Sequence, residues 1–275
     1  MPLMRLIDSH CHLQADRFVD DVALVVGAAR LAGVERILVP GWDLASSRGA
    51  LDLVDRFPSL DAAVGVHPHN AAPPDDNAWS EIVALASDPR VVAVGETGLD
   101  FDRAFSPIDD QLANLRRNLR LAIELGKPAI LHVRSAAGRR DAQDALVAEL
   151  RAVGFGGPRV AAMFGDTPGA VIHSFSGPID YASTVLDLGL AISISGLAFR
   201  VGEESTADVA ALVPLDRLLV ETDSPFLSPP GAPRRRNEPE WVRITAGWIA
   251  ERRDILAGEL GESLVAAYET TFGRR

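Results

Sequence analysis

The feature that most constrains the fold is a regular alternation of eight short apolar runs with longer segments of helical periodicity. The runs occupy residues 4–8, 35–39, 61–66, 91–95, 128–132, 170–173, 190–194 and 217–222. They carry Val, Ile, Leu and Ala at successive positions, which is typical of parallel strands that are buried on both faces. Eight such units in 275 residues predict an α/β protein with a (β/α)8 or TIM barrel fold, in a single domain that spans residues 1–275.

The amphipathic segments between the runs supply the predicted helices. The segment 109–126 repeats its apolar residues at helical spacing and closes at Gly126 and Pro128. Further helices are predicted at 17–32, 44–56, 78–87, 140–152, 178–188, 204–213, 239–253 and 257–270. Residues 154–169 break this rhythm, because they contain five Gly, two Pro and an apolar patch. We expect a long mobile loop there, at the rim of the barrel, that affects substrate access.

Charge and cysteine content exclude several classes of protein. The chain has 27 Lys and Arg against 38 Asp and Glu, a net charge of −11, which disfavours a protein that coats duplex nucleic acid. The single cysteine, Cys11, forbids an intramolecular disulfide and a cysteine-built zinc or iron–sulfur site, and we expect it to be a small buried residue. No apolar run reaches the roughly 18 residues that cross a bilayer. We therefore expect a cytoplasmic protein with no membrane partner.

All six histidines of the chain fall at or just after the ends of predicted strands. They are His10, His12, His67, His69, His132 and His173. Three carboxylates occupy equivalent points, namely Asp8, Glu96 and Asp223. Because barrel enzymes build their active sites at the C-terminal ends of the strands, this distribution predicts a site at that face.

The histidines at the strand ends favour a metal site. His10 and His12 are two residues apart, so both side chains lie on the same side of a strand and can bind one metal ion. Taken alone, this pair is also compatible with two half-buried polar residues, and His132 and His173 with hydrogen-bonded core histidines. Four histidines and two carboxylates that converge from five strands, however, supply enough donors for two divalent ions.

The remaining polar residues at the strand ends have other interpretations. Asp8 is interpreted as a partner that holds an imidazole in one tautomer. Pro68 interrupts the alternation between His67 and His69, so His67 is expected to contact a phosphate or leaving group at least as readily as a metal.

The chain also carries a set of motifs in a fixed order. They are Asp8-Ser9-His10-Cys11-His12-Leu13, Gly65-Val66-His67-Pro68-His69, Gly95-Glu96-Thr97-Gly98-Leu99-Asp100, Leu131-His132-Val133-Arg134, His173-Ser174-Phe175-Ser176-Gly177, Glu221-Thr222-Asp223-Ser224-Pro225-Phe226-Leu227 and Arg236-Asn237-Glu238-Pro239. Together they resemble the TatD family of metal-dependent hydrolases, within the amidohydrolase superfamily, over almost the whole chain. The resemblance implies that His10 and His12 hold one metal with Asp223, that His132 and His173 hold the other, and that Glu96 bridges both.

This donor set suits hydrolysis of a phosphodiester by a water that two divalent ions activate. We assign catalytic roles to Asp223, as general base, and to Glu96 and His67. We expect His67, Arg134 and Asn237 to contact the substrate. The donors accept Zn²⁺, Mn²⁺, Fe²⁺ or Mg²⁺, and the sequence does not choose among them.

Members of the resembled family act as 3′–5′ DNases, which implies an exodeoxyribonuclease for single-stranded or frayed DNA ends. Arg134 and the run at 234–236 would make the mouth locally positive. Candidate stacking residues near the mouth are Trp42, Phe101, Phe175, Phe199 and Phe226. An alternative is a binuclear hydrolase of a small ester, amide or phosphate, because fold does not determine chemistry. A third is a barrel that binds metal without catalysis.

Overall fold

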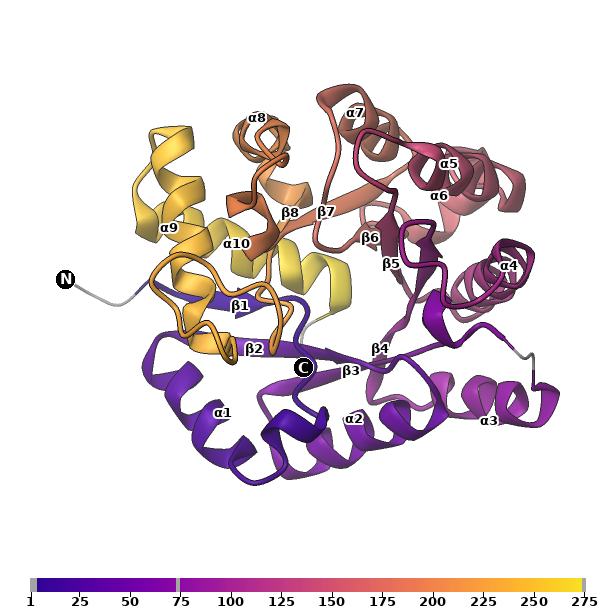
Figure 1. Cartoon of the computed structure of the whole chain (residues 1–275), viewed down its shortest axis with the longest axis horizontal. Coiled ribbons are helices and arrows are strands. Elements are labelled where there is room, and N and C mark those ends of the chain that lie inside the picture. Colours follow the sequence, from indigo (N-terminus) through magenta and orange to yellow (C-terminus); the bar gives the residue numbers. More distant parts are fainter. Residues whose placement is uncertain (1–3, 73–74, 274–275) are drawn as a thin grey trace.

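The computed structural model describes residues 4–72 and 75–273, and it forms a barrel of eight parallel strands. The strands follow one another in sequence order and the helices form an outer ring (Figure 1). They are β1 (Leu6–Asp8), β2 (Val34–Pro40), β3 (Leu60–Val64), β4 (Val91–Asp100), β5 (Ala129–Arg134), β6 (Ala170–Ile172), β7 (Leu190–Ile194) and β8 (Leu218–Val220). The segments that follow β1 and β8 close the ring, because the backbone N–H of Ser9 donates to Val220 (3.0 Å) and that of Asp223 donates to His10 (2.9 Å). The predicted (β/α)8 fold is confirmed.

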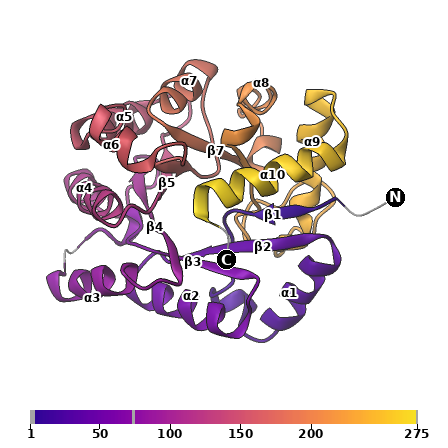
Figure 2. The same ribbon diagram turned by 180° about the vertical axis from the view of Figure 1, so that it is seen from behind.

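The helices cover the outside of the barrel and one of its ends. They are α1 (Val22–Leu31), α2 (Leu44–Arg56), α3 (Asp76–Ala86), α4 (Ile108–Leu125), α5 (Asp141–Val153), α6 (Pro158–Phe164), α7 (Ile179–Asp187), α8 (Ser205–Leu212), α9 (Val242–Arg253) and α10 (Ala257–Phe272). α10 lies across the end of the barrel where the strands begin (Figure 2). There Tyr268 of α10 donates a hydrogen bond to Asp61 of β3 at 2.8 Å. The C-terminal ends of the strands lie at the opposite end of the barrel, which α10 does not cover. Within the described ranges, no helix is long and apolar enough to cross a membrane.

The segment 154–169, expected to be a mobile loop, contains the helix α6, so that prediction is wrong. Its glycines act as helix boundaries, because Gly154 ends α5 in a left-handed conformation (φ +108°) and Gly157 precedes Pro158 at the first position of α6. Phe155 is 3% exposed, and its ring stacks on that of Phe164 with centroids 6.5 Å apart. The segment is therefore part of the packed outer layer.

Truncation of Phe155 tests this correction. We expect Phe155→Ala to lower the free energy of unfolding by about 3 kcal/mol, because it leaves a cavity where a buried ring was. Met163→Ala, in the same segment but 44% exposed, is the control and should change it by less than about 0.5 kcal/mol. Urea unfolding followed by circular dichroism measures both. If both variants changed the free energy of unfolding equally little, residues 154–169 would be a loosely attached loop after all.

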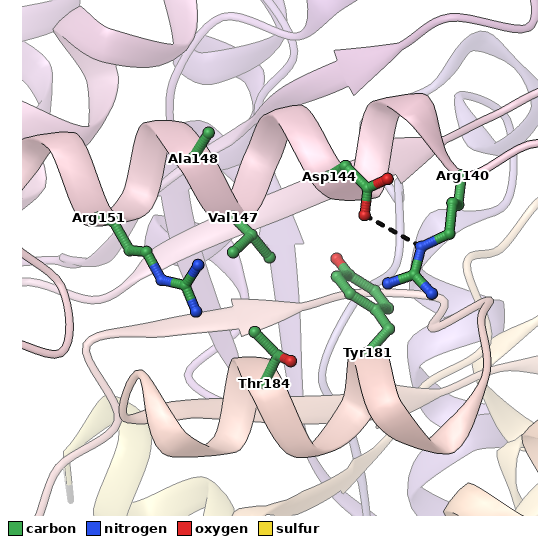
Figure 3. A pocket seen from close by; sticks show the side chains of 7 residues that line it. All are labelled: Arg140, Asp144, Val147, Ala148, Arg151, Tyr181 and Thr184. Carbon is green, nitrogen blue, oxygen red and sulfur yellow. Dashed lines mark hydrogen bonds and ion pairs between the residues drawn. The ribbon is translucent and has the colours of Figure 1, made fainter.

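A hollow of about 300 Å³ lies between α5 and α7 on the outer ring (Figure 3). Its lining includes Arg140 and Asp144, which form an ion pair at 3.0 Å, and the buried Tyr181. None of the six histidines lines it. The histidines and the carboxylates that face them lie together elsewhere, at the C-terminal ends of the strands.

Candidate metal centre

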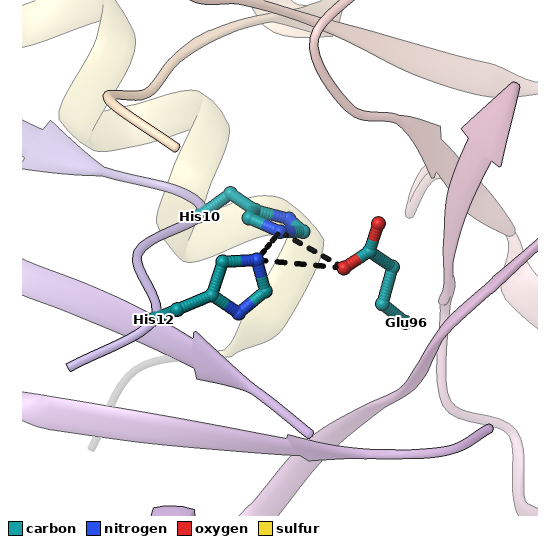
Figure 4. A group of neighbouring side chains, drawn as sticks. All are labelled: His10, His12 and Glu96. Carbon is teal, nitrogen blue, oxygen red and sulfur yellow. Dashed lines mark hydrogen bonds and ion pairs between the residues drawn. The ribbon is translucent and has the colours of Figure 1, made fainter. Parts of the chain in front are cut away.

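Glu96 of β4 lies at the middle of the histidine cluster, and its two carboxylate oxygens face different imidazoles. Glu96 Oε2 lies 3.3 Å from Nε2 of His10 and 3.6 Å from Nε2 of His12 (Figure 4). Its Oε1 lies 2.9 Å from Nε2 of His173 and 3.3 Å from Nδ1 of His132. Asp223 faces the first pair, with its Oδ1 at 3.4 Å from Nε2 of His12. The structure thus brings together the six residues that the sequence singled out as metal ligands.

The local backbone explains why Glu96 reaches the centre. β4 continues through the Gly-Glu-Thr-Gly motif instead of ending at residue 95, so Glu96 lies inside the strand. Gly98 has φ +142°, and a Cβ there would lie 1.9 Å from the backbone oxygen of His132. Only glycine permits β4 and β5 to approach this closely.

Asp223 is held in an uncommon conformation. Its φ of +54° lies in the left-handed region, which costs a non-glycine residue roughly 1–3 kcal/mol. The hydrogen bonds from Asp223 N–H to His10 and from Phe226 N–H to Asp223 (2.8 Å) hold the backbone there. This turn presents the carboxylate to His12.

The donor set fits divalent metal ions. Within the described part of the chain, four groups of three residues have ligand atoms that lie within 4.8 Å of one another, among them His10–His12–Glu96 and His10–His173–Asp223. Imidazole and carboxylate are the usual ligands of Zn²⁺ and Mn²⁺. Burial raises the pKa of Glu96, but the surrounding imidazoles outweigh it and hold that pKa well below its usual value. Glu96 is therefore an ionised carboxylate that faces imidazole nitrogens on both sides.

Two further carboxylates, which sequence reasoning missed, contact the outer nitrogens of His132 and His173. Glu221 Oε1 lies 3.2 Å from Nδ1 of His173, and Asp100 Oδ2 lies 3.4 Å from Nε2 of His132. Each carboxylate accepts a hydrogen bond from the imidazole N–H and so fixes the tautomer in which the other ring nitrogen faces Glu96. Strand alternation could have found Asp100, because it lies four residues after Glu96 and so on the same face of β4.

Neutralising Glu221 tests this role. We expect Glu221→Gln to weaken metal binding by about 10- to 100-fold, because the carboxylate that orients His173 is lost. Glu203→Gln is the control: this rim carboxylate accepts a hydrogen bond from Ser176 (2.9 Å) and should leave metal affinity unchanged. Titration of metal-free protein against a chromophoric chelator gives both affinities. Wild-type affinity in Glu221→Gln would show that His173 is oriented by packing alone.

His67 is arranged as a hydrogen-bond donor to the site. Its Nδ1 accepts a hydrogen bond from the backbone N–H of His69 at 3.1 Å, so in the neutral ring the proton resides on Nε2. That nitrogen lies 3.3 Å from Glu96 Oε1. Burial lowers the pKa of His67 to about 4, which keeps the ring neutral at physiological pH. This geometry favours contact with a negative oxygen over metal ligation.

Two other residues, Asn237 and Asp8, differ from their expected roles. Asn237 is fully buried and donates to the backbone oxygens of Thr222 (3.0 Å) and Phe226 (2.8 Å), so the predicted substrate contact is wrong and Asn237 instead fixes the segment after β8. Asp8 touches no imidazole. It accepts hydrogen bonds from the backbone N–H groups of His10 (3.3 Å) and Thr222 (2.9 Å) and so ties the end of β8 to that of β1.

The arginines near the mouth are partly neutralised. Arg236 is half-buried and pairs with Asp21 (2.8 Å) and Glu238 (2.7 Å), so it adds little positive charge to the mouth. Arg134 is exposed and pairs with Asp102 at 2.9 Å. Cys11 is buried, as expected.

Comparison with known proteins agrees with this geometry. The family model described as "TatD related DNase" matches residues 7–273. The chain belongs to the TatD family. A relative from Edwardsiella piscicida named "3'-5' ssDNA/RNA exonuclease TatD" is 36% identical over 93% of this chain and 98% of its own. Another, from Bacillus subtilis, is named "Uncharacterized metal-dependent hydrolase YabD" and is 32% identical over 93% of this chain and 94% of its own.

Solved TatD structures share the whole architecture. The TatD homologue YJJV of Escherichia coli superposes with a TM-score of 0.85 and 30% identity over all of both chains. A TatD-family hydrolase of Entamoeba histolytica has the same fold, with a TM-score of 0.84 and 20% identity over all of both chains. The protein is therefore a metal-dependent hydrolase of the TatD type, and the resemblance inferred from its motifs is confirmed.

Proposed function

We propose that this TatD protein is a 3′–5′ exonuclease that holds two divalent metal ions and hydrolyses the terminal phosphodiester bond of single-stranded or frayed DNA. The observation that carries the proposal is that the two carboxylate oxygens of Glu96 face different pairs of histidines. Its Oε2 faces His10 and His12, and its Oε1 faces His132 and His173. One carboxylate between two sets of imidazoles suits a bridging ligand. The name of the Edwardsiella relative supports the substrate class.

Each residue of the site has a task in this proposal. Divalent ions bound by His10, His12 and Asp223, and by His132 and His173, would activate water and neutralise charge on the phosphoryl oxygens. Asp223, whose carboxylate is 14% exposed, accepts the proton of the attacking water at Oδ1. His67 donates its Nε2–H to a phosphate or leaving-group oxygen.

The charges around the site favour the ends of a DNA strand as substrate. The body of the protein carries a charge of −11, which repels a long duplex. The exposed Arg134 lies at the rim, within reach of a phosphate that enters the mouth. We propose that cleavage occurs at ends and weakens as salt rises. The single, buried cysteine is consistent with a reducing compartment such as the cytoplasm.

A substrate panel tests the proposal. Metal-reconstituted protein is offered 5′-labelled single-stranded DNA, the same strand with a blocked 3′ end, the matching RNA and a small aryl ester. We expect a ladder that shortens from the free 3′ end and close to two equivalents of metal per chain by elemental analysis. Ester hydrolysis without strand shortening would assign the site to a small-substrate hydrolase. A value of one equivalent or less, unchanged in His132→Ala, would overturn the two-metal centre.

A further inference from the structure

Two exposed phenylalanines border the metal centre. The chain has ten Phe, four Trp and two Tyr, and all of them lie in the described ranges. Of these, Phe105 (67% exposed) and Phe226 (51% exposed) are the exposed ones, and the other aromatic residues are buried or half-buried. Both exposed rings contact histidines at the barrel mouth. Their position beside the candidate metal centre makes both rings candidates for contact with the substrate.

Phe226 lies on the side of the mouth formed by β1 and β8. Its ring centroid is 6.2 Å from that of His12, and the guanidinium carbon of Arg17 is 5.8 Å from the same centroid. The backbone of Phe226 is fixed by its N–H bond to Asp223 and by the amide of Asn237. The ring is therefore held in an exposed position beside the cluster, with a cation next to it.

Phe105 lies on the opposite side of the barrel, on the connection between β4 and α4. Its centroid is 4.7 Å from that of His69, whose Nε2 is hydrogen-bonded to Asp100 at 2.7 Å. The neighbouring Ser106 fixes this connection, because its hydroxyl donates to the backbone oxygen of His69 (3.1 Å) and accepts from Ala72 N–H (3.2 Å). Phe105 is thus also held exposed by the backbone around it.

The other aromatic residues near the mouth are less suited to stacking. Phe175 is 1% exposed and stacks on Tyr181, and Phe199 packs against Trp248. Trp42 lies 5.3 Å from His12 but is only half-exposed.

We propose that Phe226 and Phe105 stack on the two nucleobases that flank the bond to be cleaved, one on each side of the metal centre. This inference rests on the proposed nuclease function and specifies how that site selects its substrate. Stacking on a π-face accepts any base but requires an unpaired one. A protein with a net charge of −11 would thereby hold a single strand or a frayed end without coating a duplex.

Removing a ring and removing a base should have the same effect. In Phe226→Ala and Phe105→Ala we expect KM for an eight-nucleotide oligothymidylate to rise about tenfold, since one base loses the ring on which it stacks. The same KM is measured on strands with an abasic residue at the terminal or the penultimate 3′ position. On one of these two strands each variant should have the wild-type KM, because the base that its ring contacts is already absent. The two rings should respond to different positions. Phe226→Trp should restore wild-type KM, and Val201→Ala, fully exposed but not aromatic, is the control.

Binding without cleavage separates this proposal from the proposed function. Fluorescence anisotropy of the same labelled strand, with protein in EDTA, should show the same loss of affinity in both variants. If binding in EDTA depends on both rings but the metal-reconstituted protein does not shorten the same strand, the exonuclease is refuted and the stacking sites are retained. Strands that are shortened with wild-type KM by both variants, or an effect that persists on both abasic strands, would refute the stacking sites and retain the exonuclease.

Discussion

Glu96→Gln is expected to lose metal and activity together. Among the residues that the structure describes, only Glu96 has two oxygens that face both sets of imidazoles, so the amide removes the shared negative charge from both at once. It also leaves buried histidines around a neutral group, which weakens binding of either ion. We expect kcat/KM to fall by more than about 10³-fold, with less than one equivalent of metal retained in elemental analysis.

Glu203→Gln is the control for this variant as well, because Glu203 belongs to the rim and contacts Ser176. Thermal unfolding of metal-free protein shows whether Glu96→Gln folds, since the wild type without metal is the matched reference. Retention of two equivalents of metal with near-normal activity would mean that Glu96 is not the shared ligand.

Asp223→Asn is expected to separate binding from catalysis. Asparagine keeps an oxygen that faces His12 but accepts no proton from water at neutral pH. We expect kcat to fall by more than about 10²-fold while a measurable part of the metal remains bound. Steady-state kinetics at saturating metal, together with elemental analysis of the same sample, provides both values.

His67→Gln gives the comparison for that result. Its amide retains a donor for the substrate oxygen, so activity should fall less than in Asp223→Asn. Activity of Asp223→Asn near wild type at saturating metal would remove Asp223 from the role of general base and leave the proton to another group.

The barrel and the location of the site follow from the pattern of residues along the chain. Eight apolar runs at regular spacing admit few arrangements, because each run must be buried on both faces and each is followed by a helix. All eight runs overlap strands, and each segment predicted as a helix overlaps one of α1–α5 and α7–α10. The C-terminal ends of parallel strands meet at one face, so histidines at those ends converge whatever the details of packing. The ligand candidates followed from this topology.

Other features were decided only by the tertiary structure. The segment 154–169 contains α6 and packs onto the outer layer, where Phe155 stacks on Phe164, and the glycine content of the segment does not reveal this contact. Glu221 reaches His173 across 48 positions, and Asn237 turns inward to Thr222. Spacing along the chain indicates which face of a strand a residue occupies, but it does not indicate which residue of a distant strand contacts it. The closed barrel brought those partners together, and it left two phenylalanine rings exposed beside the histidines.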